Sequence, residues 1–186
     1  MRNTTDTTAT GDAFVFQMRG DSSVDIKKQL GNVPWITKEG FLDPAQFPID
    51  SVLKQALSDD DRQLRTGLNM LGAMNVHGRT EAGVFLLGLL VNCEDNWEKR
   101  IKIVEAMKGI DTRPCADLLF SELKRVKSSN TTRRYLAAVI KVLSDMPSEL
   151  IEDGFQTLAE DGSFSPKMRD KFRAVLEKRL FGDHGW

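Results

Sequence analysis

Few residues in this chain have the types and spacing that catalysis requires. There are two histidines in 186 residues, and His77 lies in the segment NVHGR with no serine or cysteine nucleophile at a recognisable spacing. The pKa of a histidine suits general-base catalysis, but the base needs a nucleophile beside it. We therefore interpret His77 as a solvated residue in a turn between helices, and we predict a protein without enzymatic activity.

The sequence also has no recognisable pattern for binding metal or phosphate. Cys93 and Cys115 form no CxxC pair and have no neighbouring histidine, which favours packing residues over zinc ligands. The acidic run 59–61 stands at a predicted helix start, where carboxylates cap backbone N–H groups. The glycines in NVHGRTEAGVFLLG follow no strand and precede no GK[ST] sequence. We therefore expect no metal and no cofactor.

One type of charged residue recurs. An arginine follows each predicted helix start, at Arg65, Arg100, Arg134 and Arg169. A cation near a helix N-terminus opposes the helix dipole, so another group must stabilise each of these arginines. The favoured interpretation is a carboxylate or carbonyl group in the adjacent repeat. The alternative is a basic edge that neutralises phosphates or an acidic peptide.

The elements that position these residues repeat along the chain. Four residues of the N-cap type are spaced by 35 positions each: Asp60, Asp95, Asn130 and Ser165. The residues three and six positions after each arginine are apolar, for example Ala137 and Ile140 after Arg134. This spacing predicts a buried stripe on the first helix of every unit.

Each unit also contains a predicted second helix. These helices start at Thr80, Pro114 and Ser148, and their apolar residues follow an i, i+4, i+7 pattern, as in 82, 86 and 89. Two helices of about 12 residues cannot bury their stripes alone, whereas a stack of helix pairs can. Residues 50–57 look like the second helix of an incomplete preceding unit. We therefore predict an all-α array of helix pairs over residues 50–180.

The repeated segments resemble a known family. DRQLRTGLNMLGAMNVHGRTEAGVFLLGLLVNCED resembles a HEAT-like repeat of the phycobilisome-lyase type, with an acidic cap, an arginine, a short turn and a leucine-rich second helix. The segments NWEKRIKIVEAMKGIDTRPCADLLFSELKRVKSSN and TTRRYLAAVIKVLSDMPSELIEDGFQTLAEDGSFS repeat this layout, and PKMRDKFRAVLEKRL resembles a terminal first helix. The resemblance implies a right-handed α-α superhelix, a solenoid of about three and a half helix pairs, whose second helices line a concave surface.

The remaining segments do not repeat. Residues 1–12 are polar and threonine-rich, which predicts a disordered tail, and residues 181–186 form a short C-terminal tail. Residues 13–49 contain three prolines and several aromatic residues, which predicts an irregular N-terminal arm that caps the first repeat.

Composition limits the location of the protein. The longest apolar run, 84–91, is well short of the roughly 18 residues of a membrane span, so we expect no membrane insertion. The first twelve residues contain no apolar segment typical of a secretory signal, and two cysteines suit a reducing compartment. We therefore expect a cytoplasmic protein.

The predicted function is a non-catalytic scaffold or adaptor that binds another protein through the concave surface. The charged residues expected to contact that partner are Arg79, Asp117, Glu122, Lys124, Arg125, Glu149 and Glu152. The alternative is nucleic-acid binding, as in HEAT-like DNA glycosylases. It is not favoured, because the sequence has neither a strongly cationic groove nor a recognisable acidic catalytic residue. A chromophore lyase is a third hypothesis, and it rests on the repeat subtype alone.

Overall fold

The computed structural model describes residue 43 and residues 45–182, with side chains as far as Lys178. Contacts divide the chain into two units, Met1–Pro48 and Ile49–Trp186, and the second is described here. The predicted tail at 1–12, the predicted arm as far as residue 42 and the last four residues lie outside the described residues.

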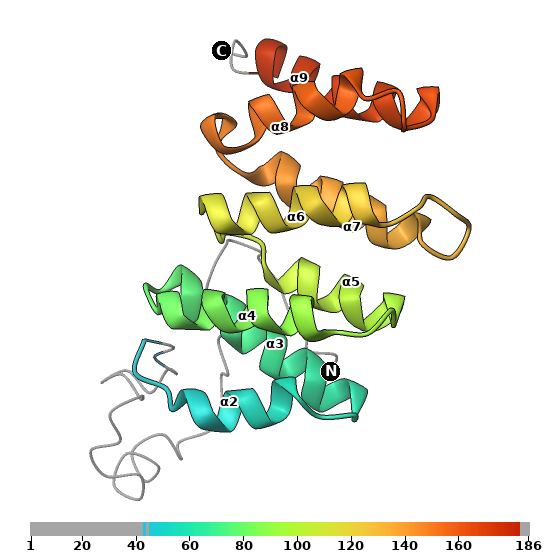
Figure 1. Cartoon of the computed structure of the whole chain (residues 1–186). Helices are drawn as coiled ribbons and strands as arrows, with labels where there is room; N and C mark the ends of the chain where they lie inside the picture. The colour runs from blue at the N-terminus through green and yellow to red at the C-terminus, as the bar shows by residue number, and fades with distance from the viewer. Residues whose placement is uncertain (1–42, 44, 183–186) are drawn as a thin grey trace, which may run out of the picture. The chain divides into compact units, whose positions relative to one another are not determined.

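The described residues contain eight α-helices and no strand, which confirms the all-α prediction (Figure 1). The helices are α2 (Ile49–Ala56), α3 (Asp61–Val76), α4 (Thr80–Asn92), α5 (Trp97–Ala106), α6 (Arg113–Arg125), α7 (Arg133–Asp145), α8 (Ser148–Glu160) and α9 (Pro166–Gly182). In Figure 1 they follow one another in chain order, from α2 at the bottom to α9 at the top.

Several helices pack against a neighbour in the chain, and several against the next helix but one. Helix α3 packs against α2, α4 and α5, helix α5 also packs against α7, and α6 packs against α7 and α8. The first helices of successive pairs, α3, α5 and α7, therefore adjoin one another, as the second helices α6 and α8 do. An amphipathic helix in this arrangement buries its stripe between neighbours on two sides.

The buried stripe recurs on the first helices, in the predicted register on α3 and in a different one on α7. Buried side chains stand at three equivalent positions: Leu64, Leu68 and Leu71 on α3, Arg100 and Val104 on α5 with Met107 at its C-cap, and Tyr135, Val139 and Val142 on α7. The prediction of Ala137 and Ile140 was wrong, because Ala137 is exposed and Ile140 is only half-buried. The position equivalent to Arg100 is Tyr135 and not Arg134. Successive residues on a helix are rotated by about 100°, so Arg134 and Tyr135 point in different directions.

The predicted helix starts are partly correct. Asp60 is the N-cap of α3, and its carboxylate accepts a hydrogen bond from the Gln63 backbone N–H at 2.8 Å. Helices α4 and α8 begin at Thr80 and Ser148 as predicted, and α6 begins at Arg113, one residue before the predicted Pro114. Among these four helices a side-chain cap is formed only at α3; α4, α6 and α8 begin at or next to the predicted residues without one.

Two predicted caps were wrong by one or two residues. Asn96, not Asp95, caps α5, and its side-chain oxygen accepts a hydrogen bond from the Lys99 N–H at 3.1 Å. The predicted cap of α7 at residue 130 is displaced to Thr132, whose hydroxyl donates to the Lys127 carbonyl in a turn that precedes the helix. Both errors arise because the loop lengths vary around the predicted period of 35 residues.

The tight turns after α3 and α5 depend on glycine. Gly78 and Gly109 have φ values of 89° and 83°, in the left-handed region that a side chain disfavours. Each follows the last turn of a first helix and redirects the chain into a second helix. The turns predicted at 75–78 and 109–112 lie at 77–78 and 107–109 in the structure, so each prediction is correct to within two or three residues.

Candidate functional site

A buried ion pair links three helices at the centre of the unit. The Arg100 guanidinium on α5 lies against the Glu122 carboxylate on α6, with Nη2 and Oε2 2.5 Å apart. The Tyr135 hydroxyl on α7 donates a hydrogen bond to the same carboxylate oxygen at 2.6 Å. Arg100 Nη1 also donates to the Cys93 carbonyl at 2.6 Å. These contacts join the second helix of one pair to the first helices on either side.

Aromatic rings enclose the Arg100 guanidinium. Its central carbon lies 5.3 Å from the Tyr135 ring centroid and 6.0 Å from that of Trp97. The Trp97 and Tyr135 rings pack against each other with centroids 5.4 Å apart. The rings exclude water from the cation and attract it through their π electrons.

Hydrogen bonding keeps both members of this pair charged. Burial raises the pKa of Glu122, but hydrogen bonds from Arg125, Tyr135 and Arg100 outweigh burial and lower it below the usual value. Burial alone lowers the pKa of Arg100, and its contacts with Tyr135 and Glu122 reverse that effect. Burial and the Glu122 carboxylate raise the pKa of Tyr135. The cluster therefore holds a carboxylate, a guanidinium and a neutral phenol.

The cluster has the chemistry of a structural network. Arg100 is 2% exposed and Glu122 6%, so a substrate has no route to the paired atoms. Both Nη atoms of Arg100 are hydrogen-bonded, and its buried Nε has no hydrogen-bond partner. A buried pair with most of its polar atoms bonded orients helices, whereas a catalytic pair must reach its substrate.

The predicted arginine column does not form one surface. Arg65 lies on the exposed side of α3 and pairs with Asp61 on its own helix, with Nε and Oδ2 3.2 Å apart. Arg134 is also exposed and reaches back to Glu98 on α5, with Nη1 and Oε1 2.6 Å apart. Arg100 is buried, and Arg169 is half-buried with its Nε shielded from solvent. The alternative of a common basic edge is therefore not supported, because the four arginines differ in exposure. The favoured interpretation, a carboxylate of the adjacent unit, holds for Arg134, whose partner Glu98 lies on the preceding first helix.

One of the predicted partner-contacting residues does not lie at the surface. Glu122 is buried and its carboxylate is occupied by Arg100, Arg125 and Tyr135, so its placement on a binding surface was wrong. Arg79 is half-buried at the N-cap of α4. The other five are exposed: Asp117, Lys124, Arg125, Glu149 and Glu152. They come from α6 and α8, the second helices of two successive pairs.

Helix α4 has an exposed apolar face that the sequence reasoning did not select. Val84 is 66% exposed, Phe85 39% and Val91 64%, and they account for three of the five large exposed hydrophobic residues among the described ones. Val84, Gly88 and Val91 are spaced i, i+4, i+7, so they share one side of the helix. The opposite side, with Ala82, Leu86 and Leu90, packs into the core (its residues are all fully buried).

A signal for this face was present in the sequence. From Ala82 to Val91 helix α4 contains no polar side chain, so it is apolar around its whole circumference. A helix of this kind is normally buried on all sides or covered by a partner. The stripe predicted at residues 82, 86 and 89 accounts for the side of α4 that packs into the core. The apolar residues outside that stripe indicated a second contact surface on the same helix.

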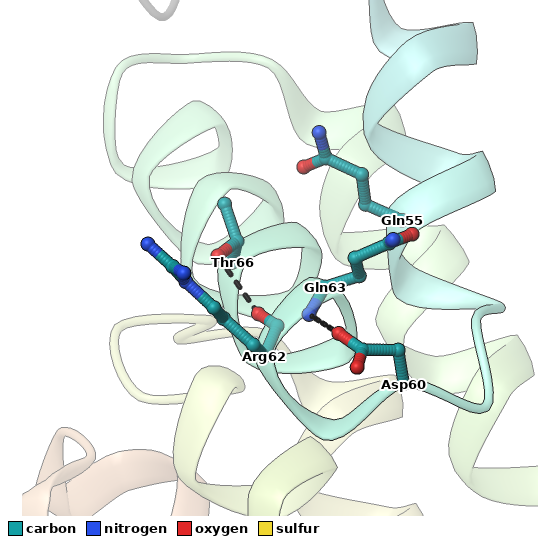
Figure 2. A pocket seen from close by; sticks show the side chains of 5 residues that line it. All are labelled: Gln55, Asp60, Arg62, Gln63 and Thr66. Atoms are coloured by element: carbon teal, nitrogen blue, oxygen red, sulfur yellow. Dashed lines mark hydrogen bonds between the residues drawn. The ribbon is translucent and has the colours of Figure 1, made fainter.

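A shallow polar depression lies where α2 meets the start of α3 (Figure 2). Gln55, Asp60, Arg62, Gln63 and Thr66 line it. The two hydrogen bonds drawn there are local to the helix: Asp60 accepts from the Gln63 backbone, and Thr66 donates to the Arg62 carbonyl. The Asp60 and Thr66 side chains are therefore engaged in a capping bond and a helix bond, and the lining residues do not form a pair of acid and base.

The thiols and the turn histidine do not come together. Both cysteines are free thiols; Cys115 is buried and Cys93, at the C-cap of α4, is half-buried. Burial raises the pKa of Cys115 to about 12, so its reactive thiolate is suppressed. His77 is exposed at the C-cap of α3. Within the described part of the chain, no group of three or more His, Cys, Asp or Glu side chains is placed to hold a metal ion.

The described residues form an all-helical unit in which a buried ion pair joins three helices and α4 exposes an apolar face. Comparison with protein-family models, with curated proteins and with solved structures finds no match for this chain. Among the residues that the structure describes, no helix combines the length and apolar character needed to cross a membrane.

Proposed function

We propose that this protein is a non-catalytic interaction scaffold, in which second helices of successive pairs bind another protein. On this proposal the helix pairs form a right-handed HEAT-like solenoid of about three and a half units, and the protein acts in the cytoplasm. The apolar face of α4 supplies the anchor, and the charged residues of α6 and α8 form the rest of the surface.

The exposure of Val84, Phe85 and Val91 on one helix is the observation that carries this proposal. Single exposed hydrophobic residues are ordinary on a protein surface, whereas a contiguous apolar face marks an interaction site. The same helix is firmly seated by Ala82, Leu86 and Leu90 on its other side, so it presents a rigid surface. A rigid apolar patch with a charged surround is the usual composition of a protein interface.

Nucleic-acid binding through the arginines receives no support from their contacts. Arg65 and Arg134 lie beside Asp61 and Glu98, and Arg100 is buried against a carboxylate. Phosphate binding needs cations that are gathered on one face and exposed. We therefore do not advance this alternative.

Affinity capture with matched variants tests the proposal. The full chain, the double variant Val84→Ser/Val91→Ser and the control Leu57→Ser/Val76→Ser are each used as bait under native conditions. The four substituted residues are 62–66% exposed, so both doubles should keep the fold and differ only in which surface they change. The expected result is one defined protein that the wild type and the control retain and the α4 variant loses.

Equal recovery of every captured protein by the two doubles would contradict the assignment of α4 as the anchor. Circular dichroism and thermal unfolding of the three baits provide the folding control. A difference in melting temperature between the doubles would call for the milder changes Val84→Thr and Val76→Thr, which keep the β-branched shape of the side chain and add a hydroxyl at an exposed position.

A further inference from the structure

We draw no further inference here: the strongest candidate, the exposed apolar face of α4 formed by Val84, Phe85 and Val91, carries nothing beyond the proposed function, because nothing in the structure shows what covers it.

Discussion

Arg100 and Glu122, 22 residues apart, form an ion pair in which both side chains are buried, with Nη2 and Oε2 2.5 Å apart. The pair is completed by Tyr135, which stands 35 residues after Arg100 at the equivalent position of the next first helix. One carboxylate thus joins α5, α6 and α7. The pair fixes how these helices are placed relative to each other, and its removal should have a large cost.

The first prediction concerns Glu122→Gln. This change removes the charge that compensates a buried guanidinium, and such a loss destabilises a protein by about 3–5 kcal/mol. We expect a decrease of about 3 kcal/mol in the free energy of unfolding, because the glutamine amide retains part of the hydrogen bonding. Urea unfolding monitored by circular dichroism measures it.

The matched control for that experiment is Glu98→Gln, which breaks the exposed pair with Arg134. Exposed pairs contribute about 0–1 kcal/mol, so this variant should unfold close to the wild type. Equal losses for the two variants would show that burial does not distinguish the pairs.

The second prediction is a pH dependence with a defined sign. The pKa of Glu122 is lowered in the folded protein from an ordinary value of 4.5, so the unfolded chain takes up this proton first as the pH falls. The stability contributed by Glu122 is therefore complete above pH 4.5 and is lost progressively below it. The free-energy difference between wild type and Glu122→Gln should shrink when urea unfolding is repeated at successively lower pH. A difference that grows on acidification contradicts the lowered pKa.

The third prediction contrasts two helical glycines. A methyl group at Gly67 would overlap the backbone of α2 at Ala56, whereas one at Gly88 meets open space. Gly67→Ala should destabilise the protein by about 1–3 kcal/mol through overpacking. Gly88→Ala should stabilise it by about 0.5–1 kcal/mol, because alanine restricts the unfolded chain. Thermal or urea unfolding of the two variants compares them directly, and stabilisation by both would show that α2 and α3 do not approach closely.

The fourth prediction concerns the two thiols. Cys115 is fully buried and its pKa is raised to about 12, whereas Cys93 is half-buried. A thiol reagent at mildly alkaline pH should modify Cys93 slowly in the native protein and Cys115 only after unfolding. Colorimetric thiol titration with and without denaturant counts the reactive groups, and Cys93→Ser should abolish the native reaction. Rapid modification of Cys115 in the native state would contradict its placement in the core.

Local sequence signals located several helices correctly. Helices α4 and α8 begin at the predicted Thr80 and Ser148, next to the turn residues that precede them. Asp60 caps α3, because a side-chain cap depends on a few neighbouring residues. Gly78 and Gly109 end the preceding helices for the same reason. Interactions of this range are contained in the sequence and can be recognised without the fold.

Local signals could not predict which side chain is buried where the two candidate residues are adjacent in the sequence. Arg100 and Arg134 appeared equivalent in a repeat of 35 residues, yet one is buried and the other is exposed. The loop before α7 places Tyr135 at the buried position. A shift of one residue rotates a side chain by about 100°, so small differences in loop length decide which residue enters the core.

The sequence by itself determined that this protein is built of helices and where many of them begin, because helix periodicity, caps and turns are local properties. Only the tertiary structure decided which sides of those helices remain uncovered. Helix α4 is apolar all round, so its periodicity does not distinguish the side of Leu86, which packs inward, from the side of Val84, which faces solvent. That choice depends on the neighbouring helices, whose positions are set by contacts between residues far apart in the chain.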